Sequence, residues 1–255
     1  VGHSQDAKQN LKKLFDGKSF FDYPKSVELI KRCIQLYSNE SSIIIDFFSG
    51  SATTAHAVMQ LNAEDGGKRK FIMVQLPEKT DEKSEAFKAG YKNICEIGKE
   101  RIRRAGEKIK EEAGLNGQDL DIGFRVLKLD SSNMKDIYYS ADEYDQGMLE
   151  NMQSNTKEDR TDLDLLFGCL VDWGLELDKP YTIKEINGHK VHIYNDGDLV
   201  ACFEKDLDMK TIDEIAKLQA LRVVFSDNSF VDSATKINVA EHFKMIAPDS
   251  DIKVI

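Results

Sequence analysis

The alternation of hydrophobic and polar positions predicts that helices and strands follow one another in the first part of the chain. Apolar residues recur at helical spacing over 4–16 and, more clearly, over 27–37. Two short apolar runs, Ile43–Ile45 and Phe71–Leu76, are typical of buried strands, and a helix is expected over 52–62 between them. Because two strands around a helix form a βαβ unit, we expect a parallel pair with a right-handed crossover.

The rest of the chain continues the alternation after a long helical region. Residues 84–113 are predicted to form one helix or two, and the alternating run 124–129 a third strand. A hairpin around Asn187-Gly188 is the strongest local signal, because this dipeptide suits a two-residue turn between antiparallel strands. The other elements expected are helices over 163–175, 209–219 and 233–246, and strands over 181–186, 189–194, 199–203, 221–225 and 252–255.

These elements predict an α/β protein with two domains. A partial Rossmann-like, doubly wound sheet is expected in residues 1–135, and a smaller α/β or α+β domain in 161–255. Between them, residues 136–160 continue a polar stretch that predicts a connection containing some helix. A chain of 255 residues with 41% hydrophobic positions is long enough to bury a core in each domain.

Composition narrows the classes of function. The formal net charge of −10 argues against a purely electrostatic nucleic-acid binder, although a local basic patch remains open. The four cysteines are scattered without a CxxC pair, so we expect no metal site and a reducing, cytoplasmic environment. No run approaches the ~18 apolar residues of a membrane helix, and residues 1–22 lack the apolar segment of a secretory leader. No membrane partner is therefore expected.

The stretch 43–54 contains the candidate chemistry. A strand is followed by Asp46, a turn of small residues and the start of a helix. This arrangement is typical of sites that receive an anionic, nucleotide-like cofactor on free backbone N–H groups at a helix N-terminus. The single glycine, Gly50, does not meet the three-glycine dinucleotide fingerprint, and ordinary α/β packing remains the alternative. Glu78, after the second strand, suits a ribose acceptor and a solvated charge equally well.

Two other groups of residues favour structural roles. The run Lys99–Lys110 has six basic residues against two acidic ones, which is more typical of a solvated helix face than of a phosphate-contacting one. His189 and His192 are three residues apart on a predicted strand, so they face opposite sides and do not easily share a metal.

Three segments resemble a known enzyme family. Asp46–Ala57 is similar to cofactor-binding motif I of the amino-group DNA methyltransferases, which use S-adenosylmethionine. Phe21–Ile30 resembles their motif X, which precedes motif I only in circularly permuted classes, and Phe71–Glu78 resembles motif II. The runs Tyr91–Ile102 and Gly123–Ser132 are similar to the modification subunit of type III restriction–modification systems. The rest of the chain resembles that subunit's C-terminal region more loosely.

The resemblance implies a site for S-adenosylmethionine. The backbone of Ser49–Ser51 and the Thr53 hydroxyl would hold the methionine part, with Asp46 ordering the turn. Glu78 would accept the ribose hydroxyls, and Gln75 would line the adenine side. The implied cofactor-binding positions are Phe21, Lys25, Ser26, Asp46, Phe48, Ser49, Gly50, Ser51, Thr53, Gln75 and Glu78, of which Phe21, Lys25 and Ser26 would close over the methionine end.

The chain departs from the family pattern in three places. Ser26 replaces a common proline, which is minor. Ala52 replaces a frequent second glycine, which is tolerable only if the backbone there avoids positive φ. The third departure is larger: the family needs an Asp/Asn-Pro-Pro-Tyr/Phe loop to orient the adenine amino group and stack on the flipped base, but all four prolines here are isolated. In the permuted class this loop and the target-recognition domain precede motif X, so we expect Val1 to lie downstream of both.

The sequence therefore predicts a C-terminal piece of a DNA adenine-N6 methyltransferase, without catalytic residues and inactive alone. The partners implied are DNA, a second copy of the chain and a restriction subunit. The alternative is a non-catalytic assembly module, in which residues 160–255 mediate association and the 46–54 turn is vestigial. A small-molecule methyltransferase fits less well, because motif X precedes motif I.

Overall fold

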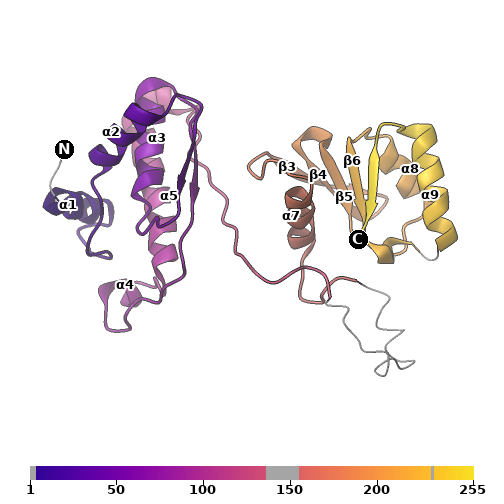
Figure 1. The fold of residues 1–255 in the computed structure, drawn as a ribbon, viewed down its shortest axis with the longest axis horizontal. Coiled ribbons are helices and arrows are strands. Elements are labelled where there is room, and N and C mark those ends of the chain that lie inside the picture. Colours follow the sequence, from indigo (N-terminus) through magenta and orange to yellow (C-terminus); the bar gives the residue numbers. More distant parts are fainter. Residues whose placement is uncertain (1–3, 136–154, 231–232) are drawn as a thin grey trace. The chain divides into compact units, whose positions relative to one another are not determined.

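A computed structural model describes residues 4–135, 155–230 and 233–255. The chain divides into two compact units, Val1–Phe124 and Arg125–Ile255 (Figure 1). Most of the connection predicted for 136–160 lies outside the described residues. Each unit contains both helices and a sheet, which confirms the α/β class expected from the sequence.

The first unit is a βαβ unit with additional helices. Its elements are α1 (Ser4–Leu14), α2 (Val27–Tyr37), β1 (Ile43–Asp46), α3 (Thr53–Asp65), β2 (Lys70–Met73), α4 (Glu85–Lys88) and α5 (Ile94–Ala113), followed by the short 3-10 turn η1 (Gly114–Gly117). Strands β1 and β2 pair in parallel, with Ile43 opposite Lys70 and Asp46 opposite Met73. The predicted parallel pair is thus confirmed, and it brings the carboxyl ends of both strands to one edge of the sheet.

Only one face of this two-stranded sheet is covered within the unit. Ile44 and Phe71 face α2 and α3 and pack against Val58 and Leu61. The opposite face exposes Ile43, Ile45 and Ile72 by 58%, 51% and 48%. The expectation that both strands are buried is therefore wrong for this face, because no described element of the unit packs against it.

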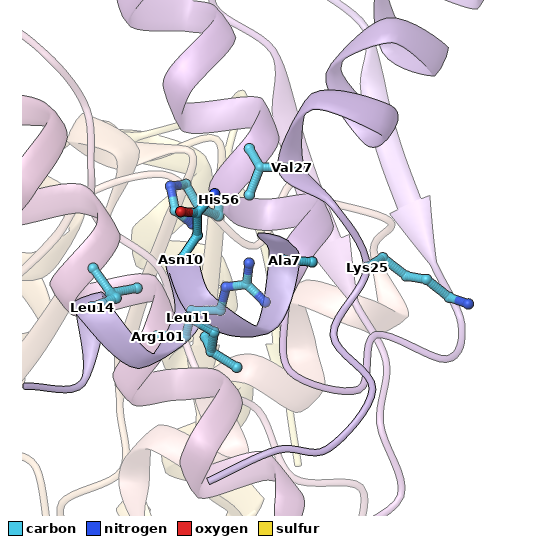
Figure 2. Close-up of a pocket in the computed structure, with 8 residues that line it drawn as sticks. All are labelled: Ala7, Asn10, Leu11, Leu14, Lys25, Val27, His56 and Arg101. Carbon is cyan, nitrogen blue, oxygen red and sulfur yellow. The ribbon is translucent and has the colours of Figure 1, made fainter. Parts of the chain in front are cut away.

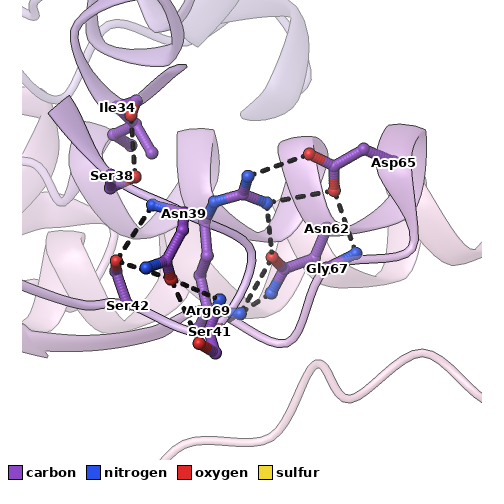
Figure 3. Close-up of polar contacts among 9 residues, drawn as sticks. All are labelled: Ile34, Ser38, Asn39, Ser41, Ser42, Asn62, Asp65, Gly67 and Arg69. Carbon is purple, nitrogen blue, oxygen red and sulfur yellow. Dashed lines mark hydrogen bonds and ion pairs between the residues drawn. The ribbon is translucent and has the colours of Figure 1, made fainter. Parts of the chain in front are cut away.

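Two polar turns set the register of β1 against β2 (Figure 3). After α3, the Asn62 side chain pairs with the backbone N–H and C=O of Arg69, at 3.1 and 2.9 Å. The Arg69 guanidinium, only 7% exposed, forms an ion pair with Asp65 at 2.9 Å and lowers the pKa of that carboxyl through its hydrogen bond. Before β1, the Asn39 carboxamide accepts from the Ser41 backbone at 3.0 Å. Both turns lie at the end of the sheet opposite Asp46.

Helix α5 forms the layer behind α3, as Figure 1 shows. It begins at the N-cap Asn93, whose side chain accepts from the Glu96 N–H at 3.1 Å. Its buried face includes Ile97 and Ile102. The region 84–113 therefore forms two helices, one of the two outcomes expected from the sequence.

The predicted strand over 124–129 does not form. These residues have no regular secondary structure, and Leu129 is fully exposed. Arg125 belongs to the second unit, where its guanidinium donates to the backbone carbonyls of Leu177 and Lys179. An extended segment held by one arginine shows the same alternation as a strand, which is why periodicity misassigned it.

The second unit is a five-stranded mixed sheet between helices. The strand order is β3 (Tyr181–Ile186), β4 (His189–Tyr194), β5 (Leu199–Cys202), β6 (Arg222–Phe225) and β7 (Asp251–Val254), antiparallel up to β5 and parallel beyond it. Helix α7 (Asp162–Asp172) covers one face, while α8 (Met209–Ala216) and α9 (Ser233–Ile246) cover the other. The hairpin predicted at Asn187-Gly188 is present, with φ values of 51° and 85°.

No helix among the described residues is long and apolar enough to cross a membrane.

Candidate functional site

The turn between β1 and α3 is organised by the carboxylate of Asp46. One oxygen accepts the N–H of Phe48 at 3.1 Å, and the other accepts the hydroxyl of Thr54 at 2.6 Å. A carboxylate at the end of β1 therefore ties down both sides of the turn that leads into α3. Its hydroxyl partner is Thr54, whereas the hydroxyl of Thr53, the residue predicted to hold the methionine part, accepts from Arg101.

The backbone of the turn is left-handed at two positions. Gly50 has φ 51° and Ala52, the N-cap residue of α3, has φ 59°. The condition that Ala52 avoid positive φ is therefore not met. For alanine the left-handed conformation costs roughly 1–2 kcal/mol. The methyl group is 2% exposed and belongs to the core formed by α3 and α5, so burial offsets part of this cost.

The turn is also connected to the segment that follows β2. The N–H of Ser49 donates to the carbonyl of Val74 at 3.2 Å, and the N–H of Gly50 donates to the Gln75 side chain at 2.7 Å. The N–H of Ala52 donates to the carbonyl of Ser49 at 2.7 Å. The expectation of free backbone donors is therefore wrong for these three amides, because local acceptors already satisfy them.

Arg101 of α5 lies beneath the turn and was not selected from the sequence. Its Nη1 donates to the Ser51 hydroxyl at 2.8 Å, to the Ser51 carbonyl at 3.3 Å and to the Thr53 hydroxyl at 2.7 Å. The residue is 2% exposed, and burial lowers its pKa to about 10. Its position gave a signal, because Arg101 interrupts the apolar stripe formed by Ile97 and Ala105 on one face of α5.

His56 of α3 lies at the same small cavity as Arg101 (Figure 2). The cavity has a volume of about 30 Å³ and is also lined by Asn10, Lys25 and Val27. His56 Nδ1 is buried and has no hydrogen-bond partner in the part of the chain that the structure describes. Burial lowers the pKa of His56 to about 3, with further contributions from the cations Arg101, Lys108 and Lys31. The imidazole is therefore neutral at physiological pH.

Of the other predicted site residues, some lie against the turn or the cavity, and the others are exposed or form no side-chain hydrogen bond. Phe21 lies against the turn, since a Cβ at Gly50 would come within 3.3 Å of the Phe21 ring, and Lys25 lines the cavity. Phe48 is 89% exposed, and the exposed Glu78 carboxylate forms no hydrogen bond or ion pair with described residues. Ser26 is the N-cap residue of α2, although its side chain makes no capping bond.

The described residues contain no group of three or more His, Cys, Asp or Glu side chains placed to hold a metal ion. The basic run on α5 is largely paired. Arg104 forms ion pairs with Glu100 and Asp16 at 2.8 and 2.7 Å. Arg101 differs from it, because it has no acidic partner among the described residues.

Comparison with known proteins shows which family the first unit is similar to. Residues 3–108 match the model of a family described as DNA methylase. This segment contains β1, the Asp46 turn, α3, β2 and most of α5. This match covers in one segment the three motifs whose resemblance to DNA methyltransferases is described above, and it supports that resemblance.

The relatives make the resemblance more specific. The Mod subunit of the type III restriction-modification enzyme StyLTI from Salmonella typhimurium is 42% identical over 125 residues, 49% of this chain and 19% of its own length. The EcoP15I Mod subunit from Escherichia coli is 29% identical over 97% of this chain and 37% of its own. The type II methyltransferase M.KpnI from Klebsiella pneumoniae is 36% identical over 37% of this chain and 22% of its own.

These matches confirm the predicted similarity to modification subunits of type III systems. The chain spans only between about a fifth and two fifths of the length of the relatives it matches.

We predict that His56 makes the first unit less stable as the pH falls below neutrality. The unfolded chain takes up a proton near pH 6.5, whereas folded His56 does so only near pH 3. Stability is therefore complete above pH 6.5 and is lost as the pH falls from 6.5 to 3. The loss at pH 5 is about 2 kcal/mol for this group alone.

Urea unfolding at pH 7 and pH 5 measures this loss. The variant His56→Gln should show a smaller difference between the two pH values than the wild type, whatever its absolute stability. His189→Gln, on the hairpin of the second unit, serves as the control and should keep the wild-type difference. Equal pH dependence in wild type and His56→Gln would contradict the prediction.

Proposed function

We propose that this chain forms the S-adenosylmethionine-binding part of a DNA adenine-N6 methyltransferase of a restriction–modification system. The observation that carries the proposal is the Asp46-ordered turn between β1 and α3, within the segment that matches DNA methylases. When bound, the cofactor would supply the methyl group. The residues of this chain would bind and orient it.

The arrangement of the site suits such a cofactor. Glu78 is an exposed carboxylate without a partner among the described residues, so it is available to accept hydrogen bonds from a ribose diol. The 89% exposed ring of Phe48 offers an apolar surface beside the turn for an adenine or a ribose. Phe21 packs against Gly50 and would close the methionine end. In this proposal Gln75 holds the Gly50 amide and thereby the shape of the turn.

The proposed assignment leaves the chemical step to residues outside this sequence. Amino-group methylation in the resembled family uses a loop with two adjacent prolines, and none of the four prolines here has a proline neighbour. We propose that such a loop and the contacts to DNA come from another polypeptide segment of a whole enzyme. A restriction subunit is the second partner that similarity to Mod subunits suggests.

We predict that two carboxylates control cofactor affinity. Asp46→Asn removes the charge that orders the turn, and Glu78→Gln removes the proposed ribose acceptor. Each hydrogen bond to a charged group contributes enough that its loss should weaken binding by about tenfold. Titration calorimetry with S-adenosylmethionine measures this effect.

The matched control is Glu82→Gln, which removes the same charge from an exposed position in the loop that contains Glu78. Its affinity should equal that of the wild type. Wild-type affinity in both Asp46→Asn and Glu78→Gln would remove the proposed site assignment.

We predict that purified residues 1–255 do not methylate DNA, because the group that orients the adenine amino nitrogen is missing from the sequence. The measurement is transfer of radiolabelled methyl groups to mixed-sequence duplex DNA. Addition of a segment that supplies the proline-pair loop should restore transfer. Methylation by 1–255 alone would refute the proposed division of roles.

A non-catalytic assembly module is the second candidate, and the exposed sheet face of the first unit favours it. Ile45 of β1 and Ile72 of β2 lie opposite each other on that face. Two residues further along the sequence from each of them come Phe47 and Val74, which are 67% and 44% exposed. A contiguous apolar face of this kind is typical of an interaction surface.

For the assembly module, we expect a tight dimer in sedimentation velocity of the isolated chain. Ile45→Lys places a charge in the middle of the face and should shift the dimer to monomer, whereas Ile183→Lys alters an exposed position of β3 and should not. A wild-type monomer at all concentrations would count against self-assembly.

A further inference from the structure

The buried guanidinium of Arg101 is an unbalanced charge next to the proposed cofactor turn. The residue is 2% exposed, and no carboxylate of the described residues pairs with it. Its three acceptors, two from Ser51 and one from Thr53, are all uncharged. A buried cation without a counter-charge is costly, by several kcal/mol. An anion placed beside this guanidinium would therefore stabilise it.

The surroundings add to this positive potential. Ser51 and Thr53 stand at the start of α3, a helix of 13 residues whose N-terminus carries a partial positive charge. Lys25 lines the same cavity and makes no hydrogen bond or ion pair with described residues. None of the eight residues that line the cavity is acidic. The Arg101 guanidinium thus lies at the start of α3 and at a cavity whose lining contains no acidic residue.

The guanidinium is also oriented as a carboxylate receptor. All three hydrogen bonds of Arg101 use Nη1, so Nη2 has no partner among the described residues, and Nε is buried without one there as well. Nε and Nη2 form the side-on fork with which arginine binds a carboxylate through two parallel hydrogen bonds. Figure 2 shows this guanidinium between α1 and His56, with Lys25 extending outward. The cavity of about 30 Å³ accommodates a group of carboxylate size.

We propose that this cavity is the subsite for the α-carboxylate of the cofactor's amino-acid end, and that Arg101 binds it through Nε and Nη2. Lys25 stands at the mouth of the subsite, and the neutral imidazole of His56 lies beside the bound group. The assignment rests on the proposed function, since it supposes that S-adenosylmethionine binds at the adjoining turn. It adds a binding residue from α5, outside the turn and the segments that precede and follow it.

With this subsite, the backbone amides of the turn need not bind the carboxylate and can donate to acceptors within the protein. The amides of Ser49, Gly50 and Ala52 donate to acceptors within the protein. The charge that attracts the carboxylate then comes from Arg101, while Nη1 of the same side chain holds the first residues of α3. One guanidinium thereby couples the shape of the turn to the presence of the ligand.

The test compares S-adenosylmethionine with decarboxylated S-adenosylmethionine, which lacks only the carboxylate. In calorimetry the wild type should bind S-adenosylmethionine at least about tenfold more tightly, as expected for a two-bond charged contact. Arg101→Gln should lose most of this preference, because its affinity for S-adenosylmethionine should fall by a larger factor than its affinity for the decarboxylated compound. Arg103→Gln, which removes the same charge from an exposed position of α5, should keep the preference.

The outcomes separate the two proposals. If the wild type binds neither compound, the proposed function fails and the subsite fails with it. If it binds both equally, cofactor binding stands but the carboxylate subsite is overturned. If Arg101→Gln weakens both compounds equally, Arg101 only supports the turn, which also overturns the subsite.

Two further measurements test the subsite even if the Arg101→Gln variant folds poorly. Arg101→Lys keeps the charge but not the fork, and it should retain only part of the preference. In the wild type, S-adenosylmethionine should raise the pKa of His56, followed by its NMR signals, because a carboxylate would face the imidazole. The decarboxylated compound should not raise it. An equal response to both compounds would count against the subsite.

Discussion

The hydrogen bonds from Arg101 to the start of α3 are the constraint on which the first unit depends. They connect α5, late in the unit, to a turn some fifty residues earlier, and the three residues that form them are buried. Asp46 fixes the same turn from the opposite side, through Phe48 and Thr54. The turn is thus held between a carboxylate and a guanidinium that do not touch each other.

Local periodicity was sufficient where an element depends on its own residues. Helix α2 occupies Val27–Tyr37, the range that the apolar spacing indicates, and the hairpin forms where Asn187-Gly188 supplies two left-handed residues. Periodicity was insufficient where contacts with residues far along the chain determine the local structure. The segment after Phe124 alternates like a strand, yet it is held by contacts of Arg125 with carbonyls more than fifty residues away.

In the candidate site too, some features follow from the local sequence and others depend on contacts with distant residues. The position of Asp46 follows from the end of a strand before a small-residue turn, and the sequence was enough to find it. Arg101 could be singled out only by its place on the apolar face of α5, because its burial without an acidic partner among the described residues is a property of the folded unit. The same holds for His56, whose lowered pKa results mainly from packing. Their residue types were visible in the sequence, whereas their surroundings were not.

Within the described ranges the sheet of the first unit consists of two strands, and each strand has one edge without a pairing partner there. Unpaired edges next to an apolar face are templates for intermolecular pairing, which soluble proteins normally cover or protect with charge. Along β1 the residues Ile43–Ile45 include no charged side chain, and Lys70 is the only one in β2. How the chain behaves at high concentration is therefore set by these backbone edges as well as by its side chains. A polypeptide that adds a strand to this sheet would pair with one of these edges and would thereby suppress aggregation.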